Sequence, residues 1–204
     1  MWTDGTVVNA LVGTAAGFAS GSVLYGAYLP MLLKRVDVTK VSEDGNPGTY
    51  NAFRYAGVPV GVLCLTCDLA KGYLPVALTK SGVHPSSLLF ALVMLAPVAG
   101  HAFSPLRGFR GGKGVAVSFG VLLALVPQQL IVFALAAAYL LSLLLPSCPD
   151  ERRTVLSFAA FAAAAALLRG PFAVKLGCLL IAAVVSYRNW ADARFAELLP
   201  RRKA

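Results

Sequence analysis

The stretch Arg107-Gly108-Phe109-Arg110-Gly111-Gly112-Lys113-Gly114 interrupts a long apolar region of the sequence. Residues 88–103 before it are apolar apart from His101, and residues 115–145 after it carry no charge. The octapeptide itself holds three cations, four glycines and no carboxylate. Apolar runs of this length are typical of membrane-spanning helices, and short cationic loops are typical of the membrane surface. The stretch therefore predicts apolar helices joined by a loop at the edge of a membrane.

Composition extends this interpretation to the whole chain. Of its 204 residues, 58% are hydrophobic and only 13% are charged, and the mean hydropathy is +0.73. A soluble domain would have about a quarter charged residues. The apolar stretch 7–33 has no basic segment before it, so it resembles a retained span more than a cleaved signal peptide. We expect an all-α, polytopic integral membrane protein, with residues 1–204 forming a single domain.

Apolar runs that reach or approach roughly 20 residues predict about seven transmembrane helices. The expected spans are 7–33, 52–80, 86–103, 114–126, 128–145, 154–169 and 171–187. Several of them are short, which leaves tilt or partial insertion open. Pro127 favours a break between the fourth and fifth spans, whereas merging those two would give six.

The basic residues select an orientation for these spans. With the N-terminus outside, fourteen of the 18 Lys and Arg residues fall on the inner side, in segments 34–54, 107–113, 152–153 and 188–203. Cytoplasmic loops of membrane proteins carry such an excess. We therefore expect a cytoplasmic C-terminus, and the net charge of +9 does not require a nucleic-acid partner.

A first polar island covers residues 37–54. It contains the turn dipeptides Asp44-Gly45 and Asn46-Pro47, which suit an ordinary cytoplasmic loop. However, Asn46, Asn51 and Arg54 cluster where a helix would begin, and helix N-termini and arginine both bind phosphate. Both interpretations stay open from the residues alone.

A second island places Asp68 and Lys71 inside an apolar stretch. Ionisable residues in a span are costly and are usually paired or functional. Their spacing puts the two on one helical face, which favours a structural polar pair, although nothing local excludes a role in binding.

The third island is the octapeptide, together with His101 shortly before it. Successive glycines let backbone N–H groups converge on an anion, and Lys113 adds a full charge. The loop is not a Walker A motif, because Gly108 precedes Gly112 by four residues and Gly114 stands where Ser or Thr would bind Mg²⁺. It therefore indicates a phosphate site without a nucleoside triphosphate and without a metal.

Taken in order, these motifs resemble the bacterial acyl-phosphate:glycerol-3-phosphate acyltransferases, the PlsY family. Residues 21–26 (Gly-Ser-Val-Leu-Tyr-Gly) are similar to its G-S-x-x-[FY]-G, and residues 45–51, followed by Arg54, are similar to its G-N-x-G-A-T-N. Its D-x-x-K-G-x-x-P segment is matched by Asp68, Lys71, Gly72 and Pro75. Residues 100–115 match G-H-x-[FY]-x-P-x-x-x-F-[KR]-G-G-K-G-V without a gap, which is a long and specific agreement.

The resemblance implies a seven-helix enzyme of the bacterial cytoplasmic (inner) membrane with a cytoplasmic active site and no cofactor. Its reaction would transfer a fatty acyl group from acyl phosphate to the 1-hydroxyl of glycerol 3-phosphate, giving lysophosphatidate and phosphate, the first step of phospholipid synthesis. The expected catalytic residues are His101, Lys113 and Asn189. The expected substrate-binding residues are Asp44, Gly45, Asn46, Gly48, Asn51, Arg54, Lys71, Gly111, Gly112 and Arg188.

The chain departs from the family pattern at several positions. Asp44 stands where the family has Ser, and an anion beside a phosphate site is unfavourable unless it pairs with Arg or Lys. Tyr50 replaces the family Thr, and Tyr187-Arg188-Asn189-Trp190 only approximates the family's C-terminal H-R-x-N. These changes leave other hypotheses open: a diverged membrane transferase with another phosphorylated acceptor, a transporter of a phosphorylated solute, or a non-catalytic lipid-binding protein. The oligomeric state also stays open, with a monomer as one option.

Overall fold

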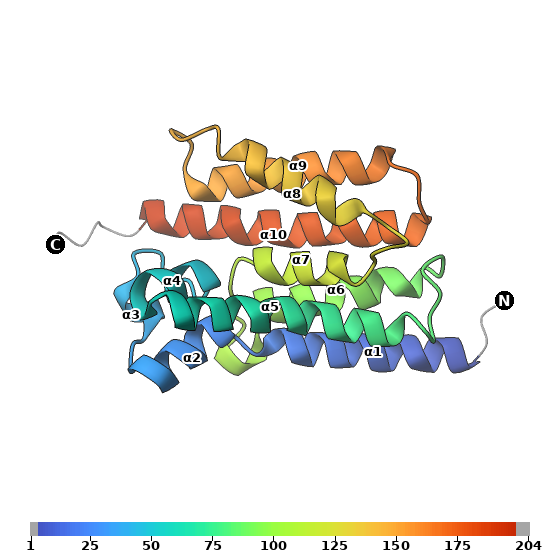
Figure 1. The fold of residues 1–204 in the computed structure, drawn as a ribbon, viewed down its shortest axis with the longest axis horizontal. Coiled ribbons are helices and arrows are strands. Elements are labelled where there is room, and N and C mark those ends of the chain that lie inside the picture. Colours follow the sequence, from blue (N-terminus) through green and yellow to red (C-terminus); the bar gives the residue numbers. More distant parts are fainter. Residues whose placement is uncertain (1–3, 199–204) are drawn as a thin grey trace.

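The computed structural model describes residues 4–198, and its side chains as far as residue 191. Every regular element in this range is a helix (Figure 1). The elements are α1 (Asp4–Ser22), α2 (Tyr25–Lys34), α3 (Val38–Val41), α4 (Thr49–Ala56), α5 (Val58–Thr79), α6 (Leu89–Ala102), the short 3₁₀ helix η1 (Pro105–Arg107), α7 (Val115–Leu123), α8 (Ile131–Ser142), α9 (Asp150–Leu167) and α10 (Phe172–Leu198). The all-α prediction is confirmed.

The long helices lie side by side along one axis, with α6 in the middle of the bundle (Figure 1). Helix α6 packs against α1 and α10, and ten of its 14 residues are buried. Gly21 and Gly100 allow α1 and α6 to approach closely, since a Cβ at either position would lie 2.1 Å from a carbonyl oxygen of the other helix. Helix α1 begins at one end of the bundle and α10 finishes at the other (Figure 1).

Several of these helices are long and apolar enough to cross a membrane. Three qualify singly by length and composition, over residues 58–79, 89–107 and 172–191. Helices α1 and α2 qualify together as one span that bends by 41°. Helix α8 is apolar but has only 12 residues, and α9 begins with the four charged residues 150–153. The chain is thus a helical membrane protein with three or four candidate spans among its described residues.

The expected first and second spans are each broken in the structure. The first is interrupted between Ser22 and Tyr25, where the Val23 carbonyl accepts a hydrogen bond from Lys71 Nζ at 2.6 Å. A broken helix inside a membrane needs such a partner for the carbonyl that it frees. The second is interrupted at Gly57, whose φ of +86° favours glycine, so residues 52–56 belong to the separate helix α4.

The break expected at Pro127 is present. Helix α7 ends at Leu123 and α8 begins at Ile131, so residues 114–145 do not form one continuous helix. Helix α7 has only nine residues and packs against α5 and α6. Its place in the bundle therefore depends on those neighbours rather than on its own length.

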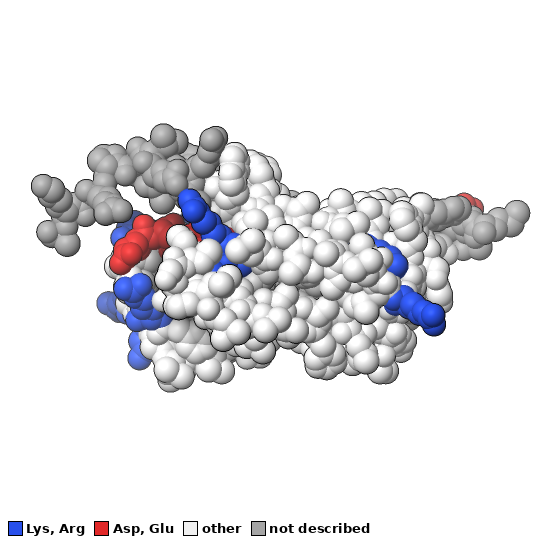
Figure 2. Space-filling view, turned by 90° about the horizontal axis from the view of Figure 1, so that it is seen from above, with Lys and Arg blue, Asp and Glu red and all other residues white. Residues whose placement is uncertain are grey.

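Charge is distributed unevenly along the axis of the bundle. Figure 2 shows charged atoms gathered toward the two ends on the face drawn, with an uncharged middle between them. Such a band is what a membrane-embedded surface requires. The large exposed hydrophobic residues, among them Leu32, Leu78 and Leu167, are therefore expected to contact lipid.

Candidate active site

The first and third polar islands meet at one end of the bundle. Lys113 Nζ lies 2.9 Å from Asp44 Oδ2, in the loop between α3 and α4. It also lies 3.0 Å from Glu151 Oε1, in the first turn of α9. The Lys113 side chain is only 15% exposed, so these two carboxylates replace much of the water around the ammonium group. The predicted phosphate lysine is thus held by two acids from distant parts of the chain.

Asp44 also organises the loop in which it lies. Its Oδ1 accepts hydrogen bonds from Asn51 Nδ2 at 2.8 Å and from the Asn46 backbone N–H at 3.1 Å. Asn51 Nδ2 further donates to the Asn46 carbonyl at 2.8 Å. Gly48 leads into α4, and the loop rests on Gly26 of α2, where a Cβ would lie 2.4 Å from the Pro47 carbonyl oxygen. Asp44 therefore fixes the Asn51 side chain and the Asn46 backbone while it also pairs with Lys113.

The ion pair shifts the titration of both partners. Burial alone would raise the pKa of Asp44, but the Lys113 charge and three hydrogen bonds lower it below its ordinary 3.8. Burial alone would lower the pKa of Lys113, but its hydrogen bond to Asp44 and the charges of Asp44 and Glu151 raise it above 10.5. Both residues are therefore charged across the physiological pH range.

The octapeptide at residues 107–114, called the glycine loop from here on, folds back on the end of α6. The Gly111 N–H donates to the Ala102 carbonyl at 3.2 Å, and the Gly112 N–H donates to the His101 carbonyl at 3.0 Å. A Cβ on Gly111 would lie 1.8 Å from the His101 carbonyl oxygen. Arg188 of α10 donates to the Gly111 carbonyl at 3.2 Å. The two amides expected to hold a phosphate are thus used within the turn, and the glycines set its shape and the place of Lys113.

Buried polar side chains form a chain from α4 to the glycine loop. Thr49 donates to Asp68 Oδ2 at 2.9 Å, and Asp68 Oδ1 lies 2.8 Å from Lys71 Nζ. Lys71 Nζ also contacts His101 Nδ1 at 2.8 Å, and a Cβ on Gly112 would lie 2.4 Å from His101 Nε2.

This chain places three partners around the Lys71 ammonium group. An ammonium group has three N–H donors, and its acceptors here are Asp68, His101 and the Val23 carbonyl. Lys71 is 3% exposed. The geometry therefore supports the structural interpretation of Asp68 and Lys71, rather than direct contact of Lys71 with a substrate.

The remaining predicted residues lie around this end of the bundle. Arg54 is about half exposed and its guanidinium lies 3.7 Å from Glu43. Gly45 has a φ of +59° in the turn after Asp44. Asn189 is fully buried, and its Nδ2 donates to the Val185 carbonyl of its own helix at 2.8 Å. Arg54 and Gly45 thus lie on the surface of the protein, whereas Asn189 is buried within the bundle.

Comparison with known proteins agrees with this geometry. Residues 11–195 match the family described as glycerol-3-phosphate acyltransferase. The chain belongs to that family. It is 32% identical to the glycerol-3-phosphate acyltransferase of Hydrogenobaculum sp. (strain Y04AAS1) over 85% of this chain and 86% of the relative. It is 41% identical to that of Myxococcus xanthus (strain DK1622) over 60% of this chain and 61% of the relative.

The fold agrees with a solved member of the family as well. The crystal structure of PlsY (YgiH), an integral membrane glycerol 3-phosphate acyltransferase in its glycerol 3-phosphate form, superposes with a TM-score of 0.79. The identity is 26%, and the match covers 91% of this chain and 90% of that protein. A second structure of PlsY, in its lysophosphatidic acid form, matches with a TM-score of 0.78.

Two residues of this acyltransferase site had no signal in the sequence. Glu151 reaches Lys113 across 38 positions, and Thr49 reaches Asp68 across 19. Glu151 is one of two acids at the start of α9, and Thr49 falls in the motif but not at a position expected to bind. The position of α9 brings Glu151 to Lys113, and the packing of α4 against α5 brings Thr49 to Asp68.

Proposed function

We propose that this protein transfers a fatty acyl group from an acyl phosphate to the 1-hydroxyl of glycerol 3-phosphate. The hydroxyl oxygen forms a new bond to the acyl carbonyl carbon, and the bond from that carbon to the phosphate oxygen breaks. The products are lysophosphatidate and inorganic phosphate, and the hydroxyl proton leaves with a phosphate group. Membership of the family and the likeness to PlsY in its two ligand forms support this reaction.

The observation that carries the proposal is the meeting of Lys113 with the Asn46–Asn51 loop. Both substrates are anions, so the enzyme has to bring two negative groups together and neutralise them. Two of the three N–H donors of Lys113 go to carboxylates, and one is left for a phosphate oxygen among the contacts that the described residues make. We assign Arg54 to the phosphate of the second substrate. Arg188, which donates to the Gly111 carbonyl, is assigned to the shape of the glycine loop.

Proton transfer is assigned to substrate phosphate rather than to His101. Because the Lys71 ammonium can only donate, His101 Nδ1 accepts and the ring proton lies on Nε2. His101 is also only 4% exposed. Its place under Gly112 suits a positioning role, and the buried Asn189 is assigned a similar role in α10. Neither residue needs to form a covalent acyl-enzyme.

The proposed site faces the cytoplasm of a bacterial inner membrane. We assign the seven apolar segments to the membrane region, with the N-terminus outside and the short α7 and α8 only partly inserted. The concentration of Lys and Arg at the end that holds Lys113 supports this orientation. In a variant whose four native cysteines are replaced by alanine, single cysteines at Lys40 and at Ser81 test it: a membrane-impermeant maleimide added to intact cells should label only Ser81→Cys.

The reaction itself is tested by phosphate release from palmitoyl phosphate, with purified protein in detergent. Release that requires glycerol 3-phosphate and yields lysophosphatidate supports the proposal. Lys113→Ala should lower the rate about a hundredfold or more, because a positioned charge that meets the developing anion is lost. Lys40→Ala is the matched control, since the Lys40 side chain is 82% exposed and, among the described residues, forms an ion pair only with Asp37 in its own helical turn.

The outcomes separate the alternatives. Phosphate release without any need for an acceptor, or equal rates for Lys113→Ala and the wild type, would refute this assignment of the site. Uptake of glycerol 3-phosphate into proteoliposomes without chemical change would instead favour a transporter.

A further inference from the structure

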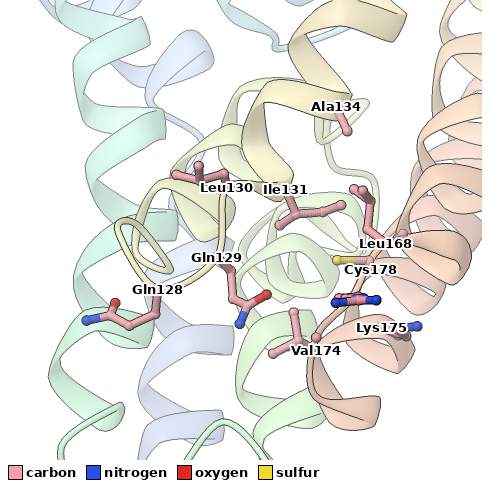
Figure 3. Close-up of a pocket in the computed structure, with 12 residues that line it drawn as sticks. Gln128, Gln129, Leu130, Ile131, Ala134, Leu168, Val174, Lys175 and Cys178 are labelled. Atoms are coloured by element: carbon pink, nitrogen blue, oxygen red, sulfur yellow. The ribbon is translucent and has the colours of Figure 1, made fainter.

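A cavity of about 300 Å³ lies at the end of the bundle opposite the proposed active site. Its walls come from the loop before α8, the first turns of α8, the end of α9 and the start of α10 (Figure 3). The proposed reaction makes no use of it. Helix α10 runs from the cavity to the proposed active site. Lys175 at the cavity and Arg188 at the active site are about 20 Å apart along its axis.

The cavity combines an apolar interior with a cationic mouth. Ile131, Val174 and Cys178 are buried in its wall (Figure 3). Arg169 and Lys175 also line it, and no carboxylate among the described residues does. Neither cation forms an ion pair within the part of the chain that the structure describes, although Lys175 Nζ donates a hydrogen bond to the Ala166 carbonyl at 2.9 Å. Two cations without a counter-ion beside a hollow favour an anionic ligand, and Arg suits a phosphate in particular.

The loop that forms one wall is tied to the end of α5. Lys80 Nζ donates to the Ala124 carbonyl at 2.7 Å and to Gln128 Oε1 at 3.3 Å, which ties the loop to α5. On the other side, the end of the Gln129 side chain lies beside Gly170, where a Cβ would be 2.8 Å from Gln129 Oε1. The cavity is therefore built into the fold rather than left by a loose loop.

The surroundings of the mouth are apolar and exposed. Leu130 is 59% exposed and Leu168 is 48% exposed, and both line the cavity. Leu167, which directly precedes Leu168, is 86% exposed, and Phe172 at the start of α10 is 69% exposed. In a membrane protein such side chains contact acyl chains, so a ligand at this mouth has hydrocarbon beside it as well as cations. A phosphate group joined to an acyl chain fits both parts.

We propose that this cavity binds an anionic glycerophospholipid of the surrounding membrane. Its phosphate lies against Arg169 and Lys175, and the upper part of one acyl chain enters the hollow past Leu130 and Leu168. This site is separate from the acyltransferase site and holds a lipid as a ligand, not as a substrate.

Native mass spectrometry of the purified protein tests this, after exchange into mixed micelles of detergent with equal amounts of phosphatidylglycerol and phosphatidylcholine. The wild type should retain phosphatidylglycerol preferentially. Arg169→Gln/Lys175→Gln should reduce that preference about tenfold or more, because each basic residue at a lipid surface contributes to anion binding. The matched control is Lys34→Gln/Lys40→Gln, which removes the same charge at the opposite end and should keep the preference.

Two further arms define the site and the source of the phosphate. Ala134→Phe fills the cavity from α8 without altering charge and should also reduce the preference for phosphatidylglycerol. Water-soluble glycerophosphoglycerol, the headgroup without acyl chains, should not displace the lipid at equal concentration. Equal retention of the two lipids by the wild type, unchanged preference in Arg169→Gln/Lys175→Gln or in Ala134→Phe, or displacement by the soluble headgroup would each overturn the proposal. Acyltransferase rates should be the same in all these variants, so the test does not depend on the proposed reaction.

Discussion

Lys113 Nζ and Asp44 Oδ2 are 2.9 Å apart, although 69 positions separate the two residues. The contact joins the glycine loop to the loop that contains Asn46 and Asn51, and Glu151 of α9 contacts the same ammonium group. A substrate phosphate that binds Lys113 must therefore share it with two internal carboxylates. These contacts weaken the binding of phosphate to Lys113, because they occupy two of its donors. They also fix the direction of the lysine side chain, which pre-organises the site.

Asp44→Asn is expected to lower the KM for glycerol 3-phosphate about fivefold, because a partly exposed ion pair is worth about 1 kcal/mol. The substitution removes the anion that faces Lys113 but keeps an Oδ1 acceptor for Asn51 and Asn46. Initial rates at varied glycerol 3-phosphate and saturating palmitoyl phosphate measure the change.

Asp37→Asn is the matched control, because Asp37 caps α3 and pairs with Lys40 outside the site. Its KM should equal that of the wild type. A KM that rises in Asp44→Asn would mean that the carboxylate assists the acceptor directly, which would contradict competition for Lys113.

The Asp44–Lys113 pair also predicts a pH dependence of stability. The pKa of Asp44 is lowered in the folded protein, so its contribution is present above 3.8 and is lost as the pH falls through the folded value. The pKa of Lys113 is raised, so its contribution is present below 10.5 and is lost as the pH rises through the folded value. The difference in Tm between the wild type and Asp44→Asn should therefore stay constant from about pH 5 to 9 and shrink only outside that window.

Differential scanning fluorimetry in detergent, at a series of pH values, measures that difference. If it disappeared near neutral pH, another titrating group would control the pair and the assignment of both charges would be wrong.

Lys71→Met is expected to lower the free energy of unfolding by about 3–5 kcal/mol, because it leaves the buried Asp68 carboxylate without its counter-charge. It also removes the donor to the Val23 carbonyl at the break between α1 and α2. Thermal unfolding in detergent measures the loss. Asp68→Asn/Lys71→Met serves as the internal control, since it removes both charges and should be less destabilised. If both variants unfolded at the temperature of the wild type, the pair would have no structural role.

The sequence predicted the helices and the polar islands well, because hydropathy and motif residues are local signals. The apolar runs appear as helices, and the break near Pro127 lies where the proline predicts it. The motif residues Asn46, Asn51 and Lys113 gather at the end of the bundle to which the basic residues point.

Other features depend on helix packing and could not be predicted from the chain. The break after Ser22 is satisfied by Lys71, 48 positions away from Val23, and Lys71 reaches His101 across 30 positions. The amides of Gly111 and Gly112 looked suitable for phosphate, but in the folded loop they meet carbonyls of α6. The requirement that Asp44 pair with a cation did follow from electrostatics, and its partner proved to be Lys113.

Gly111→Ala tests whether the close approach of the glycine loop to α6 positions Lys113. The new Cβ would lie 1.8 Å from the His101 carbonyl oxygen, a backbone atom that cannot move aside alone, so the loop must shift and carry Lys113 with it. We expect the acyltransferase rate to fall about tenfold or more, since misplacement by about 1 Å is enough for such losses. Phosphate release measures the rate, and Gly5→Ala in α1 is the control, because nothing lies within 4 Å of its Cβ. Wild-type activity in Gly111→Ala would show that Lys113 does not depend on this turn for its position.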